Sequence, residues 1–250
     1  MKNVCITSAL RTAVGSMGKS LKNVCADELG ASVIQKTVID SKIPEHEVDE
    51  IIMGQVLTGG SGQNPARQAA IKSGIPKEKP AYIVNQVCGS GIRSIVSGFQ
   101  SINSEDSKIV IAGGQESMSQ APHAIHLRDG KKLGDVELID TMIKDGLWDA
   151  FHGYHMGITA ENVAEKFQIT RAEQDKFALR SQEKALEAQK QNRFKEEIIN
   201  FKIKSKKAEI DFNKDEHPRE GINLDALTRL KPVFKKNGTV TAGNSSGIND

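Results

Sequence analysis

Residues 81–113 read AYIVNQVCGSGIRSIVSGFQSINSEDSKIVIAG. The apolar runs at 81–87 and 108–113 show little polar alternation, which is typical of strands that are covered on both faces. The stretch between them, 89–102, has the pattern of a helix that begins at a glycine-rich turn. This strand–helix–strand order predicts two parallel strands joined by a crossover helix.

The chain before this unit has the same rhythm. Further apolar runs at 4–10 and 50–57 predict strands, and the stretches 26–39 and 65–73 predict helices. Alternating strands and helices are typical of a mostly parallel sheet with helices on its faces. The predicted fold class is therefore α/β.

After Gly114 the sequence becomes polar and is broken by proline and glycine, which indicates a boundary. Thr170 and Glu173 match a capping box that opens a helix through Gln191, with Phe177, Ser181, Ala185 and Ala188 at spacings of four, four and three. Residues 238–242 then look like a strand that returns to the sheet. We predict three parts: an α/β domain at 1–117, an inserted and mainly helical loop domain at 118–237, and a returning strand at 238–250.

Composition narrows the classes of protein. The chain has 250 residues, 38% of them hydrophobic, and a net charge of +2 from 34 basic and 32 acidic residues. This balance predicts a globular protein with no global field for nucleic acid or an acidic membrane. The sequence contains neither an apolar run of about 18 residues nor the core of a secretory signal, so we expect no membrane partner and a cytoplasmic location.

One of the three cysteines stands out by its surroundings. Cys88 lies where a predicted strand turns into a helix, beside two glycines. Free N–H groups at a helix amino terminus favour a thiolate and can hold an oxyanion, so Cys88 is a candidate nucleophile. The alternative is a small buried hydrophobic residue, which is the expected role of Cys5 and Cys25. An odd number of widely spaced cysteines favours reduced thiols over a disulfide framework.

Five segments extend the pattern over the whole chain: NQVCGSG, GGQESMSQAPH, GYHMGITAEN, DEHPREG and GTVTAGNSSGIND. In this order and at these separations they resemble the thiolase family, in particular its biosynthetic acetyl-CoA acetyltransferases. The resemblance implies a thiolase-like α/β fold and makes Cys88 the residue that takes the acyl group. It also implies a second half that repeats the fold, and the motifs of that repeat are absent from these 250 residues.

The resemblance further implies contacts to coenzyme A (CoA) and its pantetheine arm by Leu147, His155, Met156, Arg219, Phe234, Ala242 and Ser246. Each residue also has an ordinary structural role open to it. Met156 and Phe234 suit a core, Arg219 a solvated surface, and Ser246 a turn.

Other matches to known motifs are weaker. Residues 13–20 resemble a phosphate-binding loop but begin with alanine, and residues 243–247 match a hydrolase elbow without a downstream histidine. The pairs His123–His126 and His152–His155 lack further ligands in a recognised metal pattern, so no metal is expected. The basic stretch at 193–207 has few aromatic residues, which favours a solvated face over a nucleic-acid groove.

The resemblance implies condensation of two acetyl-CoA to acetoacetyl-CoA and CoA, and the reverse thiolysis, with no cofactor besides these thioesters. The family's activating histidine, second cysteine and oxyanion asparagine do not occur here in their motifs, so we expect this chain alone to be inactive or nearly so. The alternatives are a degradative 3-ketoacyl-CoA thiolase and a non-catalytic subunit that needs a second polypeptide. Family members form homodimers or homotetramers, which is the assembly expected for a completed chain.

Overall fold

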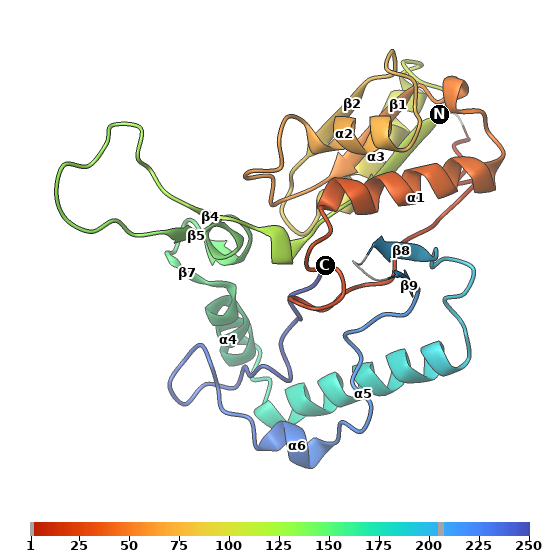
Figure 1. Ribbon diagram of the computed structural model, residues 1–250. Coiled ribbons are helices and arrows are strands. Elements are labelled where there is room, and N and C mark those ends of the chain that lie inside the picture. The colour runs from red at the N-terminus through yellow and green to blue at the C-terminus, as the bar shows by residue number, and fades with distance from the viewer. Residues whose placement is uncertain (1–2, 205–207) are drawn as a thin grey trace.

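The computed structural model describes residues 3–204 and 208–250. Its central feature is a parallel three-stranded sheet with the order β2-β1-β3 (Figure 1). The strands are β1 (Glu50–Gly54), β2 (Ala81–Val84) and β3 (Val110–Gly114). In register, Ile51 of β1 lies between Ala81 and Ile111. The parallel sheet predicted from the alternating pattern is confirmed.

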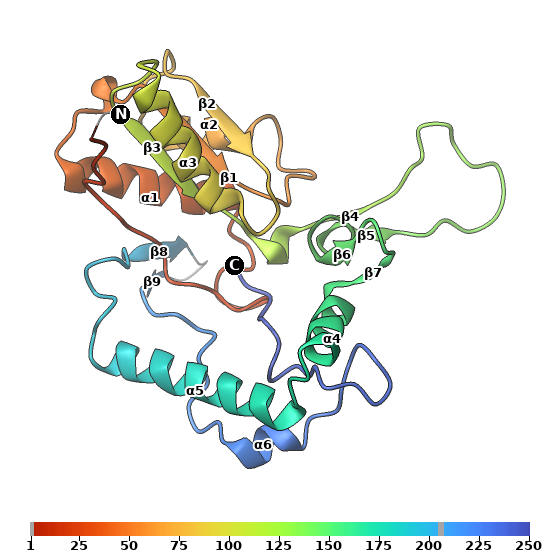
Figure 2. The ribbon, with the colours of Figure 1, turned by 180° about the vertical axis from the view of Figure 1, so that it is seen from behind.

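Helices cover both faces of this sheet (Figures 1 and 2). They are α1 (Ala26–Ser41), α2 (Pro65–Lys72) and α3 (Ser90–Asn103), each close to its predicted bounds. On one face, α1 and α2 pack against alternate strand residues such as Ile51, Met53 and Ile111. On the other face, α3 lies against Val110 and Ala112 through Gly98, where a side chain would press on Val110. The result is three layers around a single sheet.

The strand predicted at residues 4–10 does not form, which corrects the sequence analysis. Only Arg11, just beyond it, bonds in a strand-like way: its N–H donates to the Glu197 oxygen (2.8 Å), and its oxygen accepts from Ile199 N–H (2.9 Å). A strand exists only where a neighbouring strand accepts and donates its backbone hydrogen bonds. An apolar run supplies the side chains for a sheet but not that neighbour.

The region after β3 is built from short elements and two long helices. These are η2 (Met118–Gln120), β4 (His123–Ala124), β5 (Ile139–Asp140), the π-helical turn η3 (Met142–Leu147), β6 (Trp148–Asp149), β7 (Tyr154–His155), α4 (Met156–Lys166), α5 (Arg171–Lys190), β8 (Phe201–Lys204), β9 (Glu209–Phe212) and α6 (Leu224–Thr228). A further 3₁₀ turn, η1 (Glu45–Glu47), precedes β1. Residues 205–207 of the predicted basic stretch lie outside the described residues.

Helix α5 begins as predicted but packs differently. Both halves of the capping box between Thr170 and Glu173 are present. The proposed apolar stripe is wrong, because Phe177 is 77% exposed whereas Asp175 is buried. Buried Asp175 is bonded by Arg171 and Asn244, polar partners that a hydrophobic periodicity could not reveal.

The strand predicted at 238–242 is also absent, although Val240 and Thr241 are buried there. The chain returns to the first region later, where Gly15 and Asp250 exchange two backbone hydrogen bonds (2.8 and 2.9 Å). A strand-like bridge between Ser16 and Asn249 lies beside them. The three-part division at residues 117 and 237 stays a prediction.

A second hydrophobic cluster joins the sheet region, residues 3–114, to the region after β3. Ala13, Leu21, Val24 and Leu29 pack against Phe212 of β9. None of the helices that the structure describes has both the length and the apolar character to cross a membrane.

Candidate functional site

Cys88 lies in the turn between β2 and α3. Gly89 is the N-cap residue of α3, so Cys88 precedes the helix directly, and its side chain is exposed. Val87 beside it has a φ of 49°, an uncommon conformation for a β-branched residue. The predicted position of this thiol at a helix amino terminus is confirmed.

Ser90 holds this turn in shape. Its buried hydroxyl donates to the Val87 oxygen (2.6 Å) and accepts from Gln86 N–H (2.9 Å). The Asn85 side chain accepts from Val87 N–H (2.9 Å). These bonds compensate for the strained backbone at Val87 and leave the Cys88 sulfur accessible.

The turn rests directly on the ends of two strands. A Cβ on Gly54, the last residue of β1, would overlap the backbone of Ser90 and come within 2.6 Å of Gly91 N. Gly114, the last residue of β3, also lies against Gly91. Ligands of open α/β sheets bind at the carboxyl ends of the strands, and this edge is where Cys88 is placed.

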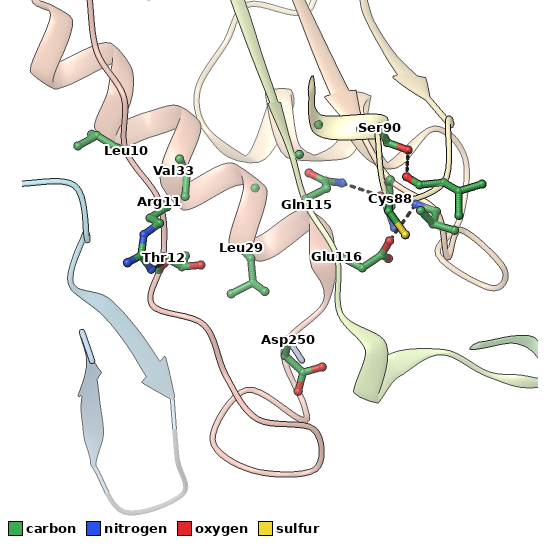
Figure 3. Close-up of a pocket in the computed structure, with 17 residues that line it drawn as sticks. Leu10, Arg11, Thr12, Leu29, Val33, Cys88, Ser90, Gln115, Glu116 and Asp250 are labelled. Atoms are coloured by element: carbon green, nitrogen blue, oxygen red, sulfur yellow. Dashed lines mark hydrogen bonds between the residues drawn. The ribbon is translucent and has the colours of Figure 1, made fainter. Parts of the chain in front are cut away.

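A cavity of about 410 Å³ opens beside Cys88. In Figure 3, Cys88 and Glu116 lie at one end of it, and Arg11 and Thr12 lie at the other. Asp250 also lines the cavity, whereas no histidine of the described part of the chain does. The cavity therefore brings the thiol together with one carboxylate that follows β3.

The carboxylate of Glu116 is bound by backbone N–H groups, with Val56 N at 2.9 Å. Burial raises the pKa of Glu116, although hydrogen bonds from the N–H groups of Val56, Leu57 and Ser117 oppose the shift. Beside it, Gln115 Nε2 donates to Gln55 Oε1 (2.9 Å), and both side chains are buried. Glu116 thus ties the loop after β1 to the end of β3.

The other two cysteines differ from the sequence expectation. Cys5 and Cys25 are exposed rather than buried, because the segment at 4–10 joins no sheet and Cys25 only precedes α1. Local burial, together with the negative charges of Glu28 and Asp27, raises the pKa of the Cys25 thiol. A thiol held protonated in this way is a poor nucleophile.

The structure brings three of the proposed CoA contacts together. The His155 and Phe234 rings stack with centroids 4.8 Å apart and planes at 19°. His155 Nδ1 accepts from Gly157 N–H (3.0 Å), which caps α4, and Met156 is the first residue of that helix. Because Gly157 has no side chain, the Phe234 ring lies directly on the helix backbone.

The remaining four residues lie at varying places. Half-buried Leu147 ends η3, next to Trp148, whose strand position pairs with His155. Ala242 and Ser246 are exposed on the loop after Val240, and Arg219 is exposed on the loop after β9. None of the seven proposed CoA contacts lines the cavity beside Cys88.

Comparison with known proteins supports one assignment. A profile of the thiolase N-terminal domain matches residues 4–250. The chain belongs to the thiolase family.

Proteins named acetyl-CoA acetyltransferase match nearly the whole chain. The acetyl-CoA acetyltransferase of Rhizobium meliloti (strain 1021) is 56% identical over 248 residues, which are 99% of this chain and 63% of that protein. The acetyl-CoA acetyltransferase of Shinella zoogloeoides is 54% identical over 245 residues, which are 98% of this chain and 62% of that protein. The chain thus spans less than two thirds of the length of these curated relatives.

A solved thiolase confirms the fold. The crystal structure of the Bacillus anthracis acetyl-CoA acetyltransferase superposes with a TM-score of 0.95 at 42% identity, covering 98% of this chain and 62% of that one. The predicted thiolase-like α/β fold is therefore correct.

Two buried carboxylates of this thiolase chain escaped the sequence analysis. Glu161 on α4 and Asp175 on α5 are 4% and 0% exposed. In the sequence, each looks like an ordinary charged residue on a helix. The only available signal was that Glu161 belongs to the segment GYHMGITAEN on which the resemblance rests.

Proposed function

We propose that this chain is the part of an acetyl-CoA acetyltransferase that carries the acyl-accepting residue, Cys88. The observation that carries the proposal is an exposed thiol at the start of α3, on the carboxyl edge of the sheet and beside a cavity. Similarity to proteins named acetyl-CoA acetyltransferase supports the choice of reaction. The substrates would be acetyl-CoA and, in the reverse direction, acetoacetyl-CoA with free CoA.

The reaction divides into two acyl transfers. The Cys88 thiolate attacks the carbonyl carbon of acetyl-CoA, the thioester C–S bond breaks, and CoA leaves as a thiolate. A base then removes a methyl proton from a second acetyl-CoA, and the resulting carbanion attacks acetyl-Cys88. The new C–C bond forms as the Cys88 sulfur leaves, which restores the thiolate and releases acetoacetyl-CoA. No cofactor other than the CoA thioesters belongs to this proposal.

The residues beside Cys88 account for only part of this chemistry. The N–H groups of Gly89 and Ser90 already donate to the Gln86 and Val87 oxygens (3.0 Å each), and among the described residues no histidine lines the cavity to serve as a general base. Losing a positioned base typically lowers rates by about 100- to 10,000-fold. We therefore expect the 250-residue polypeptide by itself to show Cys88 acylation at most.

Acyl transfer to Cys88 is directly testable by mass spectrometry. In the full chain incubated with acetyl-CoA, we expect an acetyl group on Cys88 and its loss in Cys88→Ser. Cys25→Ser is the matched control, because Cys25 is also exposed and also precedes a helix. A label on Cys25 would overturn the proposal, and so would turnover that survives Cys88→Ser in the chain joined to the missing half.

The choice among thiolases depends on chain length of the substrate. Once the missing half is supplied, comparing thiolysis of acetoacetyl-CoA with that of a long-chain 3-ketoacyl-CoA separates the acetyltransferase from a degradative thiolase. We expect the faster rate with acetoacetyl-CoA, and the opposite order would favour the degradative enzyme.

We also propose that the protein self-associates through α3 and β2. Ile92, Ile95, Val96 and Phe99 of α3 are exposed at helical spacing, with Ile92 at 71%, and β2 is an edge strand. Exposed apolar stripes beside an open sheet edge are typical of interaction surfaces. Sedimentation of the chain joined to the missing half should show a dimer or tetramer that Phe99→Lys weakens, and an unchanged assembly would contradict this surface.

A further inference from the structure

Two buried carboxylates from different helices meet one chain segment, residues 239–244. Glu161 projects from α4 and Asp175 from α5, and this segment passes between the two helices after α6 (Figure 2). The segment contains Ala242 and leads to Ser246, two of the proposed CoA contacts. Neither carboxylate has a part in the acyl transfers described above.

Glu161 binds the backbone at the start of the segment. Its Oε1 accepts from Thr239 N–H (2.8 Å) and Val240 N–H (2.8 Å), and its Oε2 accepts from the Thr239 hydroxyl (2.9 Å). Without the carboxylate, the N–H of buried Val240 would be shielded from water with no partner, and half-buried Thr239 would lose its bonds to α4. Gly238 must be a glycine for this approach, because a Cβ there would overlap the Glu161 carboxylate.

Asp175 binds the other end of the segment through Asn244. Its Oδ1 accepts from Asn244 Nδ2 (2.9 Å), and Asn244 Oδ1 in turn accepts from Thr241 N–H (2.7 Å). Arg171 Nε donates to Asp175 Oδ2 (2.8 Å), so the buried charge has an ionic partner. The loop that follows is therefore anchored on both sides of Ala242.

Helix α4 relates this loop to the other CoA contacts. His155 and Met156 stand at its start, Phe234 packs on Gly157, and Glu161 lies about one turn further along. Val233 N–H also donates to the Val240 oxygen (3.2 Å), which closes the chain between Phe234 and the anchored segment. One rigid helix thus sets the spacing between the stacked rings and the loop at 242–246.

We infer that Glu161 is a positioning residue for CoA binding, which holds the loop carrying Ala242 and Ser246 in its binding conformation. This inference rests on the proposed function. A loop that is already ordered loses little conformational entropy when the ligand binds, so its anchor contributes to affinity without touching the ligand. In Glu161→Gln the amide oxygen can still accept from the Thr239 and Val240 N–H groups, but the negative charge is lost. The amide nitrogen then replaces the oxygen that bonds Thr239 N–H (2.9 Å) and the Thr239 hydroxyl (2.9 Å), so the loop is held less firmly.

The test measures how CoA protects Cys88 from alkylation by iodoacetamide in the full chain. We call the CoA concentration that halves the alkylation rate of Cys88 the half-protection concentration. For Glu161→Gln we expect it to be about tenfold higher, the change that follows from losing one charge-assisted hydrogen bond to the loop. The alkylation rate without CoA should not change, because the Cys88 turn makes no contact with Glu161. In thiolysis by the chain joined to the missing half, KM for CoA should rise while kcat stays within about twofold.

Glu165→Gln is the matched control. Glu165 lies on the same helix, but it is exposed and its carboxylate pairs with Lys235 Nζ (3.0 Å), so half-protection should not shift. If Glu161→Gln fails to fold, Thr239→Val keeps the side-chain shape but removes the hydroxyl that donates to Glu161 Oε2 (2.9 Å) and accepts from Gln174 Nε2 (2.9 Å). A smaller shift of about threefold is expected.

The possible results are distinguishable. Equal half-protection concentrations for the unsubstituted chain, Glu161→Gln and Thr239→Val would overturn this inference and leave the proposed function intact. A lower kcat for Glu161→Gln with an unchanged KM for CoA would overturn it as well, because the loop would then act on the chemical step. A lack of any protection by CoA in the unsubstituted chain would overturn the proposed function and this inference together.

Discussion

Gly54 is the residue on which the Cys88 turn rests, and two glycine substitutions test this contact. In Gly54→Ala the new methyl group would overlap the backbone of Ser90, so we expect a loss of about 1–3 kcal/mol in unfolding free energy. In Gly91→Ala the methyl group meets no atom within 4 Å, and helix propensity should raise stability by about 0.5–1 kcal/mol. Urea unfolding measures both, and equal effects would contradict the close packing of α3 on β1.

Glu161 also gives the protein a pH dependence of stability. Burial alone would raise its pKa, but hydrogen bonds from Val240 N–H and from Thr239 outweigh burial, so its pKa in the folded protein lies below the ordinary value. As the pH falls, the unfolded chain therefore takes up the proton first, near the usual glutamate pKa of about 4.3. The stabilisation is complete above that pH and is lost as the pH falls through the lower folded pKa.

The comparison of Glu161→Gln with the unsubstituted chain isolates this contribution. The difference between their unfolding free energies should be largest at pH 7 and should shrink as the pH falls below about 4. Denaturant unfolding at a series of pH values provides the measurement. A difference that grows on acidification would mean that the carboxylate is not the form that the loop binds.

At the scale of single elements, α5 depends on its amino-terminal cap. The Thr170 hydroxyl accepts from Glu173 N–H (3.3 Å), while the Glu173 carboxylate accepts from Thr170 N–H (2.8 Å). Thr170→Ala should lower the unfolding free energy by about 1 kcal/mol because it leaves a helix donor unpaired. Ser181→Ala, at an exposed position in the middle of the same helix, should stay within about 0.5 kcal/mol.

Elements also show where a local pattern was enough and where it was not. The runs that became β1, β2 and β3 were found because a buried parallel strand is apolar along its whole length. The equally apolar run at 4–10 stayed irregular, because no neighbouring strand pairs with it. At 238–242 the sequence is strand-like, but the N–H groups of Thr239 and Val240 bond the Glu161 carboxylate instead of a neighbouring strand. The segment is therefore a buried loop.

At the scale of the whole molecule, one cluster joins the first region to β9. Leu21 is fully buried against Ala13, Leu29 and neighbouring residues, and Phe212 closes the cluster from the other region. Leu21→Ala should therefore cost about 2–5 kcal/mol and destabilise both regions in one transition. Leu133→Ala, at a residue that is 90% exposed, is the control and should change stability by less than about 0.5 kcal/mol. Two separate transitions in Leu21→Ala would show that the regions unfold independently.

The sequence by itself determined the α/β class, the place of Cys88 at a turn between a strand and a helix, and the family. These properties depend on neighbours along the chain: on apolar periodicity, on glycines at one turn, and on the order of short motifs. Only the tertiary structure decided that Glu161 and Asp175 are buried, that His155 stacks on Phe234, and that residues 4–10 remain outside the sheet. Such contacts join residues up to about 80 positions apart, as between Glu161 and Val240, and pairing over that distance leaves no periodic signal in the sequence.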